Sequence, residues 1–181
     1  LKTVNENFDL NIPYYIVVDY AFVKDVVDIV DGVDVYVPMD MDYEDPSADP
    51  PLSIHLKEGH QHLNGDQAMQ FLRFRKGYKN ADLDRVKAQQ AFMSAFVQKV
   101  KSSKGVLHAP SLLVSYMDNT SSNMPMSKVS RMGLTMMSIG EENLQTATIP
   151  GTADMIGGLS YYIVDFDGTD QLFYKMNVKQ K

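Results

Sequence analysis

The sequence predicts an α/β fold in which a mixed central sheet is flanked by helices. Two observations predict it. Stretches with strand-like patterns alternate with stretches at helical spacing through most of the chain. The 181 residues, 44% of them hydrophobic, also suffice for one domain with a sizeable buried core. We therefore expect residues 1–181 to form a single domain.

The first third of the chain gives the clearest alternation. Residues 14–18 are β-branched and aromatic on both faces, which predicts a buried strand. Apolar residues then recur at helical spacing over 22–30, and a turn is expected at Asp31-Gly32. The next strand is expected over Val33–Val37, because valines alternate there with polar or aromatic residues.

The segment 39–51 is rich in Asp, Pro and Ser, which predicts a surface loop or ribbon. A calcium site is the alternative there, but the spacing lacks the order of a calcium-binding loop. A short strand is expected over 53–56 and a turn over 59–64. Three histidines, His55, His60 and His62, surround that turn; they could bind a metal, but surface histidines without a carboxylate pattern are the favoured interpretation.

Two helices are expected next, one opening near Gly65 and one beginning at Asp82, a good N-cap residue. A polar loop over 76–80 joins them. The later chain predicts a Met-rich amphipathic stretch over 129–139, strands at 147–151 and 160–164, a polar turn over 165–171 and a short final element from Leu172.

Composition restricts the function. The formal charge of −6 excludes general attraction to nucleic acid, so any anion site must be local. Cysteine is absent, which leaves no disulfide, thiolate metal site or thiol nucleophile. No apolar run approaches the length of a membrane helix, so the chain as given is expected to be soluble.

The segment 73–89 is the best candidate for chemistry, because it holds three of the chain's four arginines. Arg73 ends one predicted helix, and Arg85 lies in the first turn of the next, where free N–H groups and the helix dipole also favour an anion. Guanidinium forks match phosphate oxygens, so Arg73, Arg75 and Arg85 could hold a pyrophosphate. The alternative is that they form local ion pairs or are simply exposed.

The motif Leu-Asn-Gly-x-x-Ala-x-x-x-x-Arg-x-Arg over 63–75, followed by Asp82-x-x-Arg85-x-x-x-Gln89-Gln90, resembles the signature of the LytR-CpsA-Psr family of cell-wall phosphotransferases. The resemblance extends over nearly the whole chain, from Ile12-Pro13-Tyr14-Tyr15 to Ser160-Tyr161-Tyr162. Combined motifs of this length are specific. One departure is Asp31, which stands where the family has the first glycine of a Gly-Gly-Val turn.

The resemblance implies transfer of a glycopolymer, with one phosphate, from a polyprenyl pyrophosphate carrier to peptidoglycan, helped by Mg²⁺ or Mn²⁺. By the same resemblance, Arg73, Arg75 and Arg85 would grip the pyrophosphate, Gln89 would hydrogen-bond near it, and Asp82 would orient the arginines. The family's metal-binding aspartates have no counterpart in this chain, so no metal ligands are expected here; they and the anchor are expected upstream, outside a Gram-positive-type cell.

Two alternatives to the transferase remain open at this point: a module that binds the lipid pyrophosphate without transfer, and a pyrophosphatase that uses water as acceptor. A second question is also open. The Met and Phe residues could pack the core, or they could line the apolar tunnel that holds the prenyl chain in the family.

Overall fold

The computed structural model describes residues 1–78, 82–102, 107–139, 143 and 145–179. The chain divides into two compact units, one of Ile16–Leu144 and one that joins Leu1–Tyr15 to Gln145–Lys181. The predicted α/β class is confirmed. The described strands form four antiparallel pairs, so small sheets flanked by helices stand where one mixed central sheet was expected.

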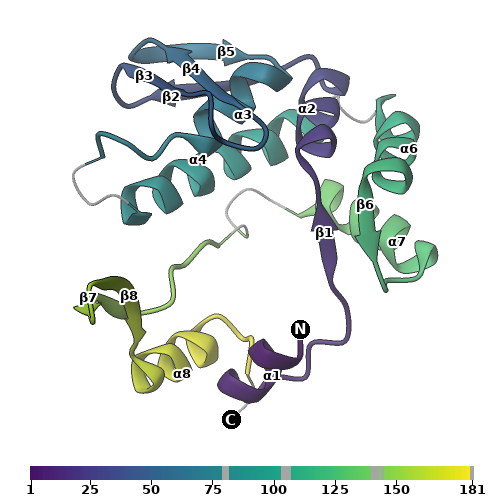
Figure 1. Ribbon diagram of the computed structural model, residues 1–181. Coiled ribbons are helices and arrows are strands. Elements are labelled where there is room, and N and C mark those ends of the chain that lie inside the picture. The colour runs from purple at the N-terminus through teal and green to yellow at the C-terminus, as the bar shows by residue number, and fades with distance from the viewer. Residues whose placement is uncertain (79–81, 103–106, 140–142, 144, 180–181) are drawn as a thin grey trace. The chain divides into compact units, whose positions relative to one another are not determined.

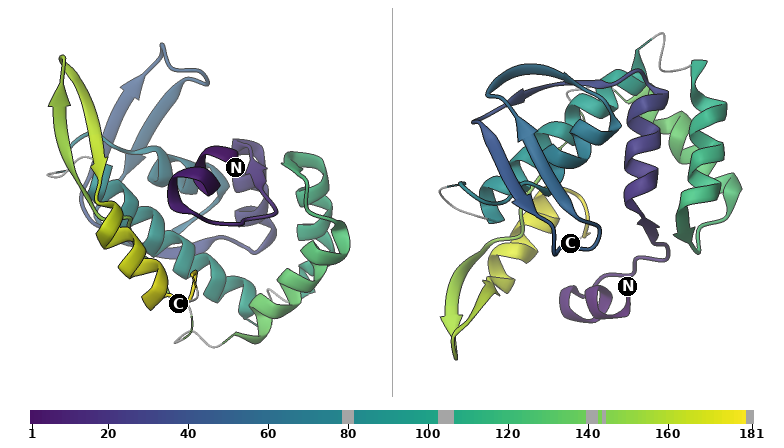
Figure 2. Two further views of the ribbon diagram at one scale, coloured as in Figure 1. Left: turned by 90° about the horizontal axis from the view of Figure 1, so that it is seen from below. Right: turned by 45° about the horizontal axis from the view of Figure 1, so that its top comes forward.

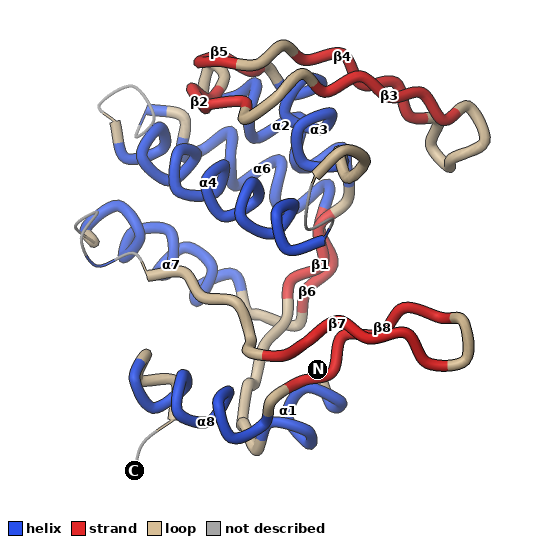
Figure 3. Tube along the Cα trace, turned by 90° about the vertical axis from the view of Figure 1, so that its left-hand side faces the viewer, coloured by secondary structure: helices blue, strands red, loops and turns tan. Residues whose placement is uncertain are grey.

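One long hairpin forms the strand layer of the larger unit (Figure 3). Its strands are β2 (Val33–Val37), β3 (Met41–Asp45), β4 (Leu52–Leu56) and β5 (Gly59–Leu63), with β2 paired to β5 and β3 to β4. Three residues separate β2 from β3 but only two separate β4 from β5, so the ribbon contains one extra residue, as in a bulge. Asp40 lies there and accepts hydrogen bonds from the Glu58 N–H and the Lys57 ammonium.

Two sequence predictions have different outcomes in this hairpin. The acidic segment was expected to be a surface loop or ribbon, and it contains β3, which forms a two-stranded ribbon with β4. The predicted turn at 59–64 is wrong, because β5 lies there. β3 and β5 are poor in β-branched residues and depend on their partners. β2 supplies the apolar pattern for β5, because Val33, Val35 and Val37 are all buried on the inner face.

Two helices, α3 (Gly65–Arg73) and α4 (Asp82–Lys101), cover the inner face of the hairpin (Figures 1 and 3). The other helices of this unit, α2 (Tyr20–Ile29), α6 (Ala109–Asn119) and α7 (Met126–Ser138), pack against helices. α3 contacts β4, α4 contacts β2, and α2 contacts both α3 and α6 (Figure 2). The core between strands and helices includes Val27, Ile54, Leu63 and Phe71, all fully or almost fully buried. The helices predicted near Gly65 and from Asp82 are confirmed.

The strand predicted over 14–18 is shorter and more exposed than expected. β1 covers Ile16–Val18 and pairs only with β6 (Thr120–Ser122) among the described strands. Val17 is 60% exposed, so the prediction of a buried strand is wrong for the described structure. An apolar run gives strand propensity, whereas burial depends on neighbours that the run itself does not specify.

The smaller unit contains α1 (Lys2–Phe8), β7 (Gly151–Ile156), β8 (Leu159–Val164) and α8 (Phe166–Lys175). Phe8 of α1 packs against Phe166 and Phe173 of α8, with ring centroids 5.9 Å apart in both pairs. The strand predicted at 147–151 begins only at Gly151. The polar turn predicted over 165–171 is wrong: Asp165 caps a helix there by accepting the Gly168 N–H at 2.9 Å.

None of the helices in the described ranges combines the length and the apolar character that a membrane crossing requires.

Candidate functional site

The first half of the Leu-Asn-Gly motif fixes the start of α3. Leu63 ends β5 and is fully buried, while Asn64 caps the helix. The Asn64 side chain accepts the Gln67 N–H at 2.9 Å, and the Gln67 side chain accepts the Asn64 N–H at 3.1 Å, which completes a capping box. These residues orient α3, and thereby the arginines that follow at its other end.

Gly65 allows α3 to approach α2 closely. A Cβ atom added there would lie 2.5 Å from the carbonyl oxygen of Lys24 and 2.7 Å from Asp28 Oδ2. The Gly65 N–H donates to Asp28 Oδ1 at 2.7 Å, and Lys24 pairs with Asp66 at 2.5 Å. The first helical residue must therefore be glycine, because any side chain would separate the two helices.

The spacing of Arg-x-Arg follows from the buried residue between them. Phe74 is 3% exposed and closes α3, so Arg73 and Arg75 on either side of it are directed away from the core. Arg73 is half-buried and Arg75 is exposed. The Arg73 guanidinium donates to the carbonyl of Pro50 at 3.2 Å and lies 4.9 Å from the centre of the Tyr20 ring. These two contacts leave most of its five N–H donors available.

One face of α4 combines polar and apolar residues in order along the helix. Arg85 and Gln89 share this face near its start, and Phe92, Met93 and Phe96 continue it at helical spacing. The Gln89 amide donates to the carbonyl of Leu72 at 3.3 Å and so also ties α4 to α3.

A cavity of about 1180 Å³ lies between these elements, all within the larger unit. α2, α3, α4 and the β3–β4 hairpin contribute to its wall. Its polar lining consists of Arg73, Arg75, Lys76, Arg85, Gln89, Asp45 and the tyrosines Tyr20 and Tyr43. Its apolar lining includes Phe22, Val26, Leu72, Phe92, Met93 and Phe96. The three arginines and the glutamine predicted from sequence therefore meet at one cavity.

The electrostatics of this cavity differ in sign from the protein as a whole. Among the described residues, four cationic side chains line it against one carboxylate, Asp45, although the formal charge of the chain is −6. Hydrogen bonds, first from the Ser47 hydroxyl, lower the pKa of Asp45 below its ordinary value, so it stays ionised. Within the described residues, no ion pair joins Arg73, Arg75 or Lys76 to a carboxylate. The wall can therefore attract an anion.

A second cavity of about 470 Å³ has an almost entirely apolar wall made by α2, α4, α6 and α7. It shares Phe22, Val26 and Phe96 with the first cavity. Its other residues include Leu112, Val129, Met132, Met136 and Met137. The Phe and Met residues therefore do not fall into one class, core or cavity wall. Phe92 belongs to the core and lines the first cavity, and Phe96 packs against the core and lines both cavities. The methionines Met132, Met136 and Met137 line the second cavity.

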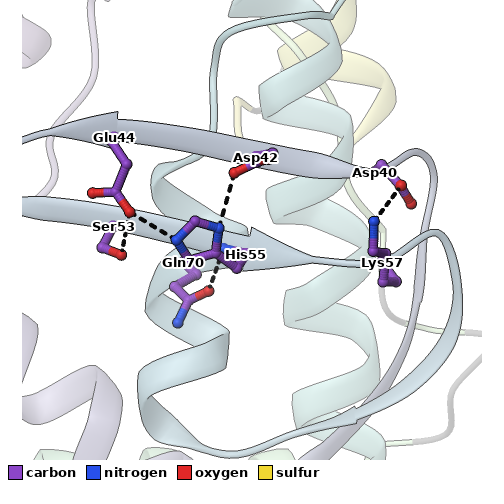
Figure 4. A network of polar contacts seen from close by, with 7 residues as sticks. All are labelled: Asp40, Asp42, Glu44, Ser53, His55, Lys57 and Gln70. Atoms are coloured by element: carbon purple, nitrogen blue, oxygen red, sulfur yellow. Dashed lines mark hydrogen bonds and ion pairs between the residues drawn. The ribbon is translucent and has the colours of Figure 1, made fainter.

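The described residues do not provide a metal site. No group of three or more His, Asp or Glu side chains in the described ranges could hold an ion. His55 lies on β4, where the sequence predicted a short strand, whereas His60 and His62 lie on β5, where it predicted a turn. His55 and His62 have carboxylate partners that the sequence analysis did not foresee. His62 contacts Asp34 at 2.8 Å, while His55 contacts Asp42 and Glu44 (Figure 4). Both rings are at least half exposed, consistent with surface histidines.

Sequence reasoning missed Lys76, Tyr20 and Tyr43, which line the same cavity. Lys76 directly follows the Arg-x-Arg motif, and that adjacency was the available signal. The tyrosines come from elements 30 or more residues before the arginines, and only the fold brings them there. The side chain of Asp82 lies outside the described residues, so its predicted role in orienting the arginines stays a prediction.

The fold and the site together define an α/β protein with a cation-lined cavity that shares three wall residues with an apolar one. The model of the LytR_cpsA_psr family matches residues 1–178, and the chain belongs to this family. The predicted family is thereby confirmed.

Individual relatives agree with this assignment. The teichoic acid transferase TagV of Bacillus subtilis is 26% identical over 170 residues, which cover 94% of this chain and 43% of TagV. TagU of Oceanobacillus iheyensis is 29% identical, covering 91% of this chain and 48% of TagU. The crystal structure of B. subtilis TagV matches the fold with a TM-score of 0.76 at 24% identity, over 97% of this chain and 66% of that structure.

The chain therefore spans less than half the length of these curated relatives.

Proposed function

We propose that this chain forms the donor-binding part of a phosphotransferase that moves a glycopolymer, with one phosphate, from a polyprenyl pyrophosphate carrier to peptidoglycan. One observation carries the proposal: four cationic side chains and an apolar wall line the same cavity. A charged headgroup and a long prenyl tail need this combination. The names of TagV and TagU, which describe transfer of teichoic acid to peptidoglycan, support the glycopolymer and the acceptor.

In this proposal Arg73, Arg75 and Arg85 bind the oxygens of the pyrophosphate. Phosphoryl transfer depends mainly on positioning and on neutralising negative charge, and planar guanidinium groups provide both. Gln89 adds a hydrogen bond next to Arg85 on the same face of α4, while its contact with Leu72 keeps that face against α3. Asp82 would orient the arginines, as the family resemblance implies.

The prenyl tail would extend from the first cavity past Phe22, Val26 and Phe96 into the second, because the two cavities share these residues. Burial of each CH₂ group contributes about 0.8 kcal/mol, so several prenyl units would dominate the affinity for the carrier.

We further propose that Mg²⁺ or Mn²⁺ assists the reaction. The described residues do not fit such an ion, since Asp45 is the one carboxylate on the cavity wall. Its ligands would belong to a part of the protein outside this chain, together with a membrane anchor at the extracytoplasmic face of a Gram-positive-type cell.

The test is calorimetric binding of a short-chain prenyl pyrophosphate to arginine variants. Replacing Arg73, Arg75 or Arg85 with Lys should weaken binding nearly as much as replacing it with Ala, because lysine keeps the charge but loses the fork. Loss of one charge-assisted hydrogen bond corresponds to roughly ten- to a hundredfold in affinity. The chain offers a matched control in Arg131, an exposed arginine on α7 that lines neither cavity.

Arg131→Ala should bind like the parent. If the Lys variants also bind like the parent, the cluster attracts anions without fixing their geometry; if all arginine variants do, the proposed site is wrong. Transfer is separated from hydrolysis and from mere binding by following release of polyprenyl monophosphate. Release that needs peptidoglycan indicates transfer, release without it indicates hydrolysis, and no release by the whole protein indicates a binding module.

A further inference from the structure

Lys76 occupies the same wall as the arginines but has a different partner. It is exposed and lines the cavity one residue after Arg75, and its Nζ lies 4.7 Å from the centre of the Tyr43 ring. No carboxylate in the described part of the chain forms an ion pair with it. Its ammonium group therefore lies over an aromatic face, in a cation–π contact.

Tyr43 is held in place by the hairpin that carries it. It lies on the inner face of β3 and is half-buried against the core, while Asp42 and Glu44 on either side point outward. On the outer face, His55 contacts both of these carboxylates, and Ser53 donates to Glu44 at 2.8 Å (Figure 4). Pairing across β3 and β4 thus fixes the strand on which the ring stands.

The Tyr43 contact leaves the ammonium group ready for an anion. A carboxylate partner would cancel the charge of Lys76 and occupy its donors, whereas the ring face leaves the three N–H donors able to bind phosphate oxygens. Arg73 is held in the same manner, over the ring of Tyr20 at 4.9 Å. Two cations of one cavity, from different positions of the chain, therefore stand on tyrosine faces.

Asp45 is the one negative group that the described part of the chain contributes to the cavity wall. Its oxygens accept from the Ser47 hydroxyl at 2.7 Å, from the Ser47 N–H at 3.1 Å and, more weakly, from the Tyr43 hydroxyl at 3.5 Å. The carboxylate of Asp45 thus accepts hydrogen bonds from its own loop and from the hydroxyl of Tyr43, the residue whose ring supports Lys76.

We propose that Lys76 is a further phosphate-binding residue of this cavity and that Tyr43 is its positioning residue. The inference rests on the proposed function in one respect only, namely that the anion bound here is a pyrophosphate headgroup. Arginine forks fix the register of the phosphates, and Lys76, on a flexible stem, adds a mobile charge that can follow the headgroup.

The experiment compares calorimetric affinity for inorganic pyrophosphate in single and double variants of the 181-residue chain. Lys76→Ala should weaken binding five- to twentyfold, and Tyr43→Leu should reproduce part of that loss. Tyr43→Phe should bind like the parent, because the ring face is retained. Lys87→Ala is the matched control: it removes one charge from α4 at a lysine that pairs with Asp84 and lines neither cavity.

The double variant Lys76→Ala with Tyr43→Leu should bind no more weakly than Lys76→Ala alone, because Tyr43 acts through Lys76. Fully additive losses, or a Lys76→Ala variant that binds like Lys87→Ala, would overturn the inference. Circular dichroism melting selects variants that fold; if Tyr43→Leu does not fold, Tyr43→Met removes the ring face and takes its place. If the arginine variants also bind like the parent, the proposed site is rejected. If only Lys76→Ala binds like the parent, only the added role of Lys76 is rejected.

Discussion

Replacing Gly65 with Ala should destabilise the larger unit, because α2 and α3 touch at this residue. The new Cβ atom would lie 2.5 Å from the carbonyl oxygen of Lys24 and 2.8 Å from its Cα. Both are backbone atoms and cannot rotate away, so α3 must move. Overpacking of this kind costs about 1–3 kcal/mol. The movement also stretches the 2.7 Å bond to Asp28, which as a bond to a charged group is worth about 1.5–3 kcal/mol.

Alanine offsets about 0.5–1 kcal/mol of this through its better helix propensity, which leaves a net loss of about 1.5–5.5 kcal/mol. The assay is urea unfolding followed by circular dichroism, with thermal melting in parallel. A protein of this size should lose roughly 3–20 °C in melting temperature. The matched control is Gly133→Ala on α7, where an added Cβ meets no atom within 4 Å.

Gly133→Ala should be neutral or stabilising by about 0.5–1 kcal/mol, because the alanine gains propensity without a clash. The reasoning is refuted if Gly65→Ala melts with or above the parent. Arg73→Ala should leave the melting temperature almost unchanged, since its neighbours are an exposed carbonyl and a ring face. The two results together would separate the part of the motif that builds the fold from the part that binds the substrate.

Three further predictions concern the turn, the hairpin and the metal. Asp31 has a φ of +62°, which favours glycine, and its contact with Lys99 uses the backbone carbonyl; Asp31→Gly should therefore stabilise the chain by about 0.5–1 kcal/mol in urea unfolding. The hydrogen bond with Glu44 is the main cause that raises the pKa of His55 above its ordinary value of 6.5. The contacts of the protonated His55 ring therefore stabilise the fold fully below pH 6.5, and this stabilisation is lost as the pH rises through the raised pKa. The melting difference between the parent and His55→Gln should accordingly be large near pH 6 and shrink by pH 9. Finally, the 181-residue chain alone should show little Mg²⁺- or Mn²⁺-dependent transfer from a polyprenyl pyrophosphate donor; full turnover, abolished by chelation, would contradict this.

The elements that could be predicted from the sequence are those whose pattern is complete within one segment. Val33–Val37 alternates buried and exposed residues as its sequence predicts, and the apolar spacing over 22–30 predicted α2. β3 and β5 could not be found in this way. Met41 and Tyr43 are the only apolar residues of β3, and β5 is a strand because β2 lies beside it. Tertiary pairing overrides weak local propensity in both cases.

The candidate site divides along the same line. Arg73, Arg75, Arg85 and Gln89 lie close together in sequence, and their spacing with the family resemblance was enough to name them. Their convergence on one cavity required the fold, since α3 and α4 meet through residues such as Phe71 and Phe92, whose rings lie 6.2 Å apart. Side chains from the hairpin and from α2 complete the wall but leave no signal near the arginines in the sequence.

The Leu-Asn-Gly and Arg-x-Arg halves of the motif therefore lie at the two ends of one helix, α3, and depend on each other through its placement. Asn64 and Gly65 set where α3 starts and how closely it lies against α2, and nine residues of helix carry that placement to Arg73. Phe74 is buried in the core at the end of the helix, so Arg73 and Arg75 on either side of it are directed away from the core. A change at Gly65 should for this reason weaken pyrophosphate binding without touching the ligand, because it displaces the helix on which the guanidinium groups stand.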